Sequence, residues 1–347
     1  MVTARVLAEI ALKHRAFHVA VSDSGHVAAL TRLGSGSLIT PDFGSVTAVD
    51  FSLEAKGAVL SPAGTQLAIT GAQSITVFST LAFEAVHQWS GSFDSCWFDS
   101  SNHLWTCKRL ESDLVSTEVW EPDNWKRIAE TTIRDPYGDS YFWLRPHPNP
   151  NWVVMWAAAG QNGQCLFWAG LEDKGVEGIR FPDLDETTWP SFNERGDEFL
   201  VVSLGEIRRY GYPSGPLHAR MQVLPGSGED RFGDFIYYTD SRRALVSSQN
   251  SRLFLVDVEN MEVEHEIAIP GHEPRPTFEL YPRLKGDRAL ASDLSFLIPL
   301  PGGSFLSVHK ETGASEAKHG YDRLAMWQLL PGLNETSAAE GPVLQTR

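Results

Sequence analysis

One structural unit recurs along almost the whole chain, and this repeat restricts the possible folds more than any other feature. The unit consists of an apolar strand, a polar turn of the Ser-Pro-x-Gly type and a second apolar strand. Seven copies are present, and they start at His18, Ala58, Ser95, Phe142, Thr188, Phe235 and Leu294. Self-similarity at a fixed period indicates supersecondary units that bury their apolar faces against one another.

Each copy continues into a third strand that ends in a large apolar residue followed by a turn. These closing residues are Ile39, Phe78, Trp120, Trp168, Tyr210, Val256 and Trp327. Their spacing is about 40 to 48 residues, except for a last interval of about 70 residues. A period of this length is typical of four-stranded propeller blades, and the Gly and Pro clusters between the short strands favour an all-β fold.

Through these turns and closing residues, the chain resembles the WD-repeat superfamily of β-propellers in a degenerate form. The Asp that follows the closing residue in that superfamily is present only as Asp257. The Gly-His pair that opens each repeat is present only at Gly271 and His272. The resemblance therefore implies an architecture, a seven-bladed β-propeller of four-stranded antiparallel blades, and no family-specific function.

The way the ring closes can also be predicted. The seventh copy ends after its third strand, whereas a strand-like stretch, TARVLAEIAL, stands at the N-terminus outside any copy. In the superfamily that the chain resembles, the first strand commonly supplies the missing outer strand of the last blade. We predict the same closure here, with Val6, Leu7 and Ile10 taking part. Residues 1–333 would form this single domain, and residues 334–347 a flexible C-terminal tail.

Charge and apolar content argue against several classes of function. The chain has 29 Lys and Arg against 44 Asp and Glu, a net charge of -15, which repels nucleic acid and anionic lipid. The longest apolar run, WVVMWAAAG, is too short to span a bilayer, and the N-terminus lacks a signal-peptide pattern. We expect a soluble, cytoplasmic, monomeric protein. Its partners would be proteins or peptides of basic or neutral charge, with no nucleic acid and no membrane.

The stretch DSCWFDSSNHLWTC, residues 94–107, raises the question of a metal site. As a hairpin with a four-residue turn, it would place Phe98 opposite His103. His103 and Cys107 would then lie roughly 13 Å apart on one strand, too far to share a zinc ion. We therefore expect buried thiols, no metal and no cofactor.

Both faces of a blade are covered by its neighbours, so this hairpin is expected to be apolar on both sides. Trp97 and Leu104 would lie on one side, and Cys96, Phe98 and Trp105 on the other. We expect packing between blades for the three tryptophans that close repeats, Trp120, Trp168 and Trp327.

The residue before each first strand is expected at the mouth of the central channel. Four of the seven blades carry a carboxylate there, at Asp94, Asp139, Asp234 and Asp293. If these groups converge, they could hold a cation, a Lys or Arg of a partner or an amine, and at least one pKa would be raised. Alternatively, each Asp caps a turn or bonds to backbone amides at the strand entrance, as Asp commonly does in loops.

Blade seven carries two long loops, residues 270–293 and 309–323, that return to the same face as the channel mouth. Long loops on a rigid scaffold are common places for binding. They would bring a set of candidate binding residues near Asp293, namely His272, Arg275, Arg283, His309, His319, Tyr321 and Asp322.

These features predict a rigid protein- or peptide-binding scaffold that uses the loop face and channel mouth around blade seven. The alternative is a small-molecule or metal-binding propeller, or a hydrolase or isomerase, in which His309 or His319 works with Asp293 or Asp322. The sequence contains no Gly-rich phosphate loop with Lys, HExxH, GxSxG or EF-hand spacing. We therefore favour a role without catalysis.

Overall fold

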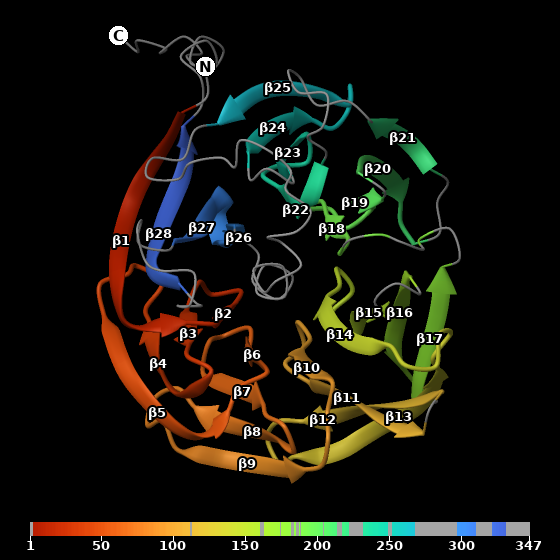
Figure 1. The fold of residues 1–347 in the computed structure, drawn as a ribbon. Coiled ribbons are helices and arrows are strands. Elements are labelled where there is room, and N and C mark those ends of the chain that lie inside the picture. The colour runs from red at the N-terminus through yellow and green to blue at the C-terminus, as the bar shows by residue number, and fades with distance from the viewer. Residues whose placement is uncertain are drawn as a thin grey trace, which may run out of the picture.

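The strands of the chain form seven antiparallel sheets of four strands each within the residues that the structure describes. This structure is a computed structural model, and it describes residues 3–111, 113–159, 163–173, 175–181, 184, 187, 189–203, 205–213, 217–221, 232–248, 252–267, 297–309 and 321–330. The sheets stand in a ring, each with one edge strand toward the centre and the other toward the outside (Figure 1). The predicted all-β, seven-bladed propeller is confirmed.

Six blades are built from four consecutive strands, which run in order from the inside of the ring outward. Blade one contains β2 (His18–Val21), β3 (Val27–Leu30), β4 (Leu33–Ile39) and β5 (Val46–Glu54). Blade two contains β6 (Gly57–Leu60), β7 (Gln66–Thr70), β8 (Ser74–Ser79) and β9 (Ala85–Ser90). Blade three contains β10 (Ser95–Phe98), β11 (Leu104–Glu111), β12 (Leu114–Glu121) and β13 (Lys126–Arg134).

Blades four to six follow the same order. Blade four contains β14 (Tyr141–Pro146), β15 (Trp152–Ala158), β16 (Gln164–Glu172) and β17 (Gly175–Phe181). Blade five contains β18 (Ser191–Phe192), β19 (Glu198–Ser203), β20 (Glu206–Gly211) and β21 (Leu217–Met221). Blade six contains β22 (Phe232–Tyr238), β23 (Arg243–Ser248), β24 (Leu253–Asp257) and β25 (Glu262–Ile267). The seven closing residues of the repeat all lie in third strands, as the period predicts.

Blade seven joins the two ends of the chain. It contains β26 (Leu297–Pro299), β27 (Ser304–His309), β28 (Tyr321–Leu330) and, as its outer strand, β1 (Thr3–Ala16). Figure 1 shows β1, in red, running beside β28, in blue. The predicted closure is confirmed: Val6 pairs with Trp327 and Ile10 with Leu324, while Leu7 lies at a shift in register. Residues 334–347, the predicted tail, lie outside the described residues.

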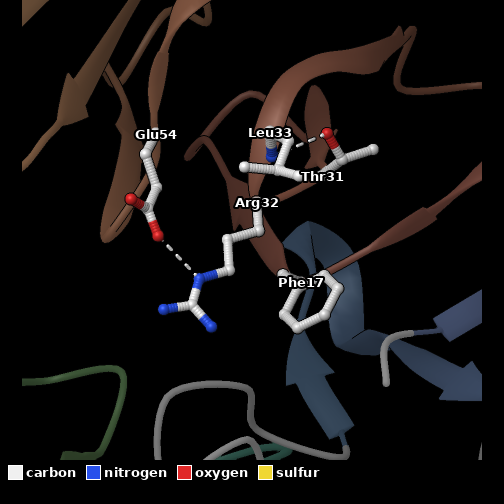
Figure 2. Close-up of a pocket in the computed structure, with 5 residues that line it drawn as sticks. All are labelled: Phe17, Thr31, Arg32, Leu33 and Glu54. Atoms are coloured by element: carbon white, nitrogen blue, oxygen red, sulfur yellow. Dashed lines mark hydrogen bonds and ion pairs between the residues drawn. The ribbon is translucent and has the colours of Figure 1, made fainter. Parts of the chain in front are cut away.

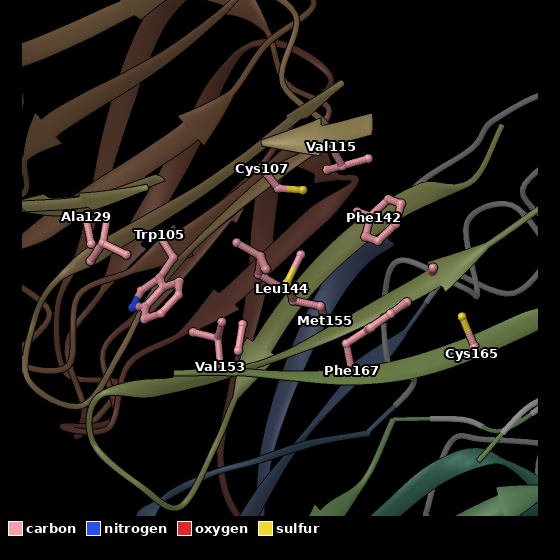
Figure 3. Packing of buried hydrophobic residues seen from close by; sticks show 13 residues of the cluster. Trp105, Cys107, Val115, Ala129, Phe142, Leu144, Val153, Met155, Cys165 and Phe167 are labelled. Atoms are coloured by element: carbon pink, nitrogen blue, oxygen red, sulfur yellow. The ribbon is translucent and has the colours of Figure 1, made fainter. Parts of the chain in front are cut away.

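The apolar core is divided among the interfaces between blades. Seven buried clusters occur in the described part of the chain, and each combines side chains from two neighbouring blades. Figure 3 shows the cluster between blades three and four, where Trp105 and Cys107 of β11 face Phe142 of β14 and Met155 of β15. Because both faces of a blade are covered in this way, its strands are apolar on both sides.

The tryptophans that close repeats do pack between blades. Trp168 belongs to the cluster between blades four and five, Trp327 to the one between blades six and seven, and both are 2% exposed. Trp120 is partly buried against the cluster between blades two and three. Packing between blades is therefore confirmed for all three.

The register of the β10–β11 hairpin differs from the sequence prediction. Phe98 pairs with Leu104 and not with His103, so the turn has five residues, 99–103, instead of four. The carboxylate of Asp99 accepts the His103 amide at 2.8 Å and the Trp105 indole N–H at 2.8 Å. Asn102 takes a positive φ of 68° in the same turn. These bonds hold His103 in the turn and delay the start of β11 by one residue.

The shift also changes which side chains share a face of the hairpin. Leu104 joins Cys96 and Phe98 toward blade two, whereas Trp105 belongs to the cluster shared with blade four. The predicted faces of Leu104 and Trp105 are therefore wrong, because one extra turn residue reverses the alternation of the second strand. Trp97 lies at the edge of both clusters.

The three cysteines are buried thiols, as predicted, and the structure contains them as free cysteines. Burial raises the pKa of Cys96 to about 12 and the pKa of Cys107 well above its usual range. Within the described ranges, no group of three or more His, Cys, Asp and Glu is placed to hold a metal ion.

His147 opens the turn between β14 and β15, and its ring is enclosed by aromatic side chains. Its side chain is 4% exposed, and four rings lie within 5.1 to 5.7 Å of it, those of Trp152, Trp168, Phe192 and Tyr212. Nδ1 accepts the Asn149 amide at 3.0 Å, so the neutral ring carries its proton on Nε2. Burial lowers the pKa of His147 from 6.5 to about 4.

Protonation of His147 should make the protein less stable in acid. The unfolded chain takes up this proton near pH 6.5, whereas the folded protein resists it until about pH 4. The free energy of unfolding therefore falls as the pH drops from 6.5 to 4, by about 3 kcal/mol for this group. Urea unfolding at pH 7 and at pH 4 measures this loss.

His147→Gln should remove that part of the pH dependence, because glutamine can still accept the Asn149 amide but does not titrate. His14→Gln, at an exposed position of β1, is the matched control and should keep the wild-type dependence. The same loss between pH 7 and pH 4 in wild type and in His147→Gln would contradict the role of His147.

Gly170 of β16 allows the indole of Trp152, its pairing partner in β15, to lie directly against the strand. A Cβ at this position would overlap the indole ring. Gly170→Ala should therefore lower the free energy of unfolding by about 1–3 kcal/mol, the usual cost of overpacking. In Gly57→Ala the new Cβ meets no atom within 4 Å, so this control should change stability by less than about 1 kcal/mol. Chemical denaturation compares the two variants, and equal losses would contradict the steric explanation.

Candidate functional site

The structure describes the side chains of only two of the four carboxylates predicted at the channel mouth, those of Asp94 and Asp139. Asp94 immediately precedes β10 and is half-buried, and Asp139 is exposed two residues before β14. Asp234 lies inside β22 instead of before it, and its side chain is outside the described residues, as is all of Asp293. Convergence of the four carboxylates therefore stays a prediction.

Asp94 bonds a backbone amide at the entrance of a strand, but that strand, β14, belongs to the neighbouring blade. The Asp94 carboxylate accepts the backbone N–H of Phe142 at 3.4 Å. Burial raises the pKa of Asp94, while the charges of Arg109 and Lys56 oppose that shift. The carboxylate that adds to the shift is Asp135, which is not a member of the predicted ring. Among the described residues, burial is thus the largest cause of the raised pKa of Asp94.

Ser95 links β10 to β14 by two hydrogen bonds. Its hydroxyl donates to the Phe142 carbonyl at 2.8 Å and accepts the Leu144 amide at 3.2 Å. Both backbone groups belong to β14, whose only strand partner is β15, so they would otherwise remain on an open sheet edge. The inner edge of blade four is thus bonded by side chains of blade three.

An ion pair organises the loop that leads from β13 into β14. Arg109 bonds the Asp135 carboxylate at 2.9 Å and also donates to the carbonyls of Gly138 and Ser140. Burial alone would raise the pKa of Asp135, but hydrogen bonds from Ser140, Tyr137 and Arg109 outweigh it and lower the pKa. A carboxylate held ionised beside a guanidinium fixes the loop, and with it the positions of the exposed Asp139 and of β14.

Aromatic side chains continue from this loop along the inside of blades four and five. Tyr141, at the start of β14, is 63% exposed, and its ring lies 5.9 Å from that of Trp143. Trp156 of β15 lies 4.9 Å from Trp143 and 4.8 Å from Trp189. Trp143, Trp156 and Trp189 are half-buried. We call these four residues the aromatic run.

A bulge before β18 explains the position of Trp189. Thr187 pairs with Ser203, and Ser191 pairs with Leu200, so the chain is one residue longer between these two pairs on the β18 side than on the β19 side. Pro190 has no N–H to donate to the ladder, and bulges of this kind redirect a side chain. Trp189 is thereby aimed at blade four, where the Trp156 indole donates to the Thr187 carbonyl at 3.0 Å.

Arg145 joins the aromatic run to blade three. Its guanidinium lies 4.2 Å from the Trp189 ring and 5.7 Å from the Trp97 ring of β10. Both distances are within the range of a cation–π interaction. One positive charge is therefore held between indoles of two blades that are not neighbours.

The aromatic run was not predicted from the sequence. The signal was present in β14, where Tyr141, Trp143 and Arg145 alternate with buried apolar residues, because alternate side chains of a strand share a face. The repeat predicts packing between blades only for the tryptophans that close third strands. Trp143, Trp156 and Trp189 occupy other positions in the repeat.

Most of the binding residues predicted in blade seven lie outside the described residues, namely His272, Arg275, Arg283 and His319. The backbone of His309 ends β27, and Tyr321 and Asp322 begin β28, while their side chains are not described. The catalytic alternative depends on these same histidines, so it has no support from the described part of the chain. Within the described ranges, no helix has the length and apolarity needed to cross a bilayer.

Comparisons with known proteins place the chain by its fold. No known protein family and no curated protein matches the sequence. Among solved structures, the chain is similar to the β-propeller domain of Cps50 (Swd1) from Myceliophteria thermophila, with a TM-score of 0.60 and 10% identity. The similarity covers 94% of this chain and 99% of that one. At this identity the likeness concerns the fold alone: the chain has the fold of a β-propeller domain.

Proposed function

We propose that the protein is a rigid binding scaffold that receives a basic or neutral segment of a partner protein on its loop face. The loop face is the side of the ring that carries the connections between blades and the loops after the second strands. One observation carries the proposal: Tyr141, the exposed end of the aromatic run, lies two residues after the exposed Asp139 and directly before Phe142, whose backbone N–H the Asp94 carboxylate accepts. Aromatic faces next to carboxylates favour a Lys or Arg side chain.

The position of Arg145 narrows where such a cation would bind. Arg145 already covers the ring faces of Trp97 and Trp189, so a second cation there would be repelled. Tyr141 and Trp143 lie four and two residues earlier on the same strand, toward Asp94. The basic side chain of a partner is therefore expected at the outer end of the run.

Two further features support binding without catalysis. The Arg109–Asp135 pair fixes the loop before Tyr141, so the site is organised before a partner arrives, which lowers the entropy cost of association. Propellers of this kind commonly act as protein-interaction scaffolds, although the fold does not dictate a function. The two long loops of blade seven would extend the same face, and we include binding by these loops in the proposal.

Affinity capture from cell extract tests the proposal. The double variant Asp94→Asn/Tyr141→Ala should recover the partner proteins of wild type at least about tenfold less well, since it removes one charge and one aromatic face. Leu217→Ala, at a 44% exposed position of the outer strand β21, is the control and should recover the same proteins as wild type. Thermal unfolding checks that all three proteins are folded.

The proposal would be wrong if the double variant recovered the same proteins in the same amounts as wild type, or if wild type recovered none. A further variant with residues 270–293 and 310–320 shortened separates the roles of the two regions. Loss of the partners in this variant alone would move the binding site from the aromatic run to the blade-seven loops.

A further inference from the structure

A second candidate site lies on the loop face at blade one, where a depression of about 400 Å³ opens to solvent. It is lined by Phe17 from the connection between β1 and β2, by Thr31 and Arg32 from the turn between β3 and β4, by Leu33 at the start of β4, and by Glu54 at the end of β5 (Figure 2). None of these residues belongs to the channel-mouth site described above. The lining combines two apolar side chains with an ion pair, the usual composition of an interface centre and its rim.

Leu33 is held out into solvent by a rigid turn. Its side chain is 80% exposed, although leucine gains by burial. The Thr31 hydroxyl accepts the amides of Leu33 at 3.3 Å and of Ser35 at 3.2 Å, and the Thr31 amide bonds the Ser35 carbonyl at 2.8 Å. Gly34 completes the turn with a positive φ of 82°. An apolar side chain fixed in this way contacts a partner with little further ordering of the backbone.

Arg32 offers the unused end of its guanidinium beside this leucine. Its Nε donates to Glu54 at 2.9 Å, and Figure 2 shows the two terminal nitrogens beyond that contact. Among the described residues, neither terminal nitrogen has an acceptor. The end of a guanidinium matches the two oxygens of a carboxylate, and Glu54 holds it in place for that contact.

We propose that this depression binds an internal segment of a partner protein in which a large aliphatic side chain stands next to an acidic one. The aliphatic side chain packs against Phe17 and Leu33, and the carboxylate takes the terminal nitrogens of Arg32. An internal segment fits better than a C-terminus, because Thr31 already occupies the turn amides that could hold a terminal carboxylate. The site is independent of the channel-mouth proposal.

The negative charge of the chain is compatible with an acidic side chain at this place. The net charge of -15 acts at long range, but salt screens it beyond roughly 8 Å at physiological ionic strength. At the depression Glu54 is paired with Arg32, and the next charged residue along the chain is the exposed Lys56. A partner carboxylate that approaches the terminal nitrogens of Arg32 therefore meets the positively charged member of the ion pair first.

Fluorescence anisotropy with the peptide Gly-Gly-Leu-Glu-Gly-Gly-amide, which carries a dye on its N-terminal amine, tests the proposal on the full-length protein. The peptide should bind with saturation, and replacing its Glu by Lys or its Leu by Gly should weaken binding at least about tenfold. Methyl NMR should place the bound peptide at Leu33 by shifts of its methyl resonances. Arg32→Gln and Leu33→Ser should each weaken binding by a similar factor, and both positions are exposed enough to leave the fold intact.

Two matched controls keep the test specific. Leu81→Ser changes a leucine that is 97% exposed in the turn after β8, and Arg134→Gln changes an exposed arginine at the end of β13. Both should bind the peptide as wild type does, and so should Asp94→Asn/Tyr141→Ala, which separates this site from the proposed function.

Three results would overturn the proposal. The first is no saturable binding at millimolar peptide, and the second is equal affinity for the Glu and Lys peptides. The third is tighter binding of acetyl-Gly-Gly-Gly-Leu with a free carboxylate, because that would assign the depression to a C-terminus.

Discussion

Burial of apolar side chains between neighbouring blades is the interaction on which the rest of the structure depends. No blade has a core of its own among the described residues, since each cluster draws its side chains from two blades. Every blade therefore requires both of its neighbours, and a ring of such units has no end blade with an exposed apolar face. The result is a rigid support for the loops on one face, which is what a binding surface needs.

Polar groups inside this apolar ring fix the alignment of neighbouring strands and blades. Asp99 bonds a backbone amide and an indole in one hairpin, and Ser95 bonds two backbone groups of the next blade. In blade seven, the Trp327 indole donates to Ser307 at 2.7 Å, which ties the third strand to the second. Each bond satisfies a buried group and also restricts how one strand or blade slides against another.

Features that depend on repeated apolar spacing could be predicted from the sequence. The number of blades and the closing residues belong to this class. The pairing of β1 with β28 was expected from the resemblance to the WD-repeat superfamily. The β10–β11 register could not be predicted, because it depends on which amide the Asp99 carboxylate accepts. The placement of Asp234 depends likewise on where β22 begins to pair.

The candidate site was harder to predict than the fold. Asp94 and Asp139 were found because their positions follow from the period of the repeat. The aromatic run was missed because it needs Trp189, whose direction is set by a bulge at Pro190 in the following blade. A β-bulge is a local departure from the repeat, so the repeat pattern does not predict it. Binding surfaces often contain such departures.

The pairing of Thr3 with Leu330 has a consequence for the order of events during synthesis. β1 is translated before blades one to six, whereas its partner β28 is translated after them. At about 5–20 residues per second, β1 waits roughly 15 to 60 seconds with its pairing edge unoccupied. Its charged residues, Arg5, Glu9, Lys13 and Arg15, and the shift in register at Leu7 are features that discourage pairing with foreign strands during this interval.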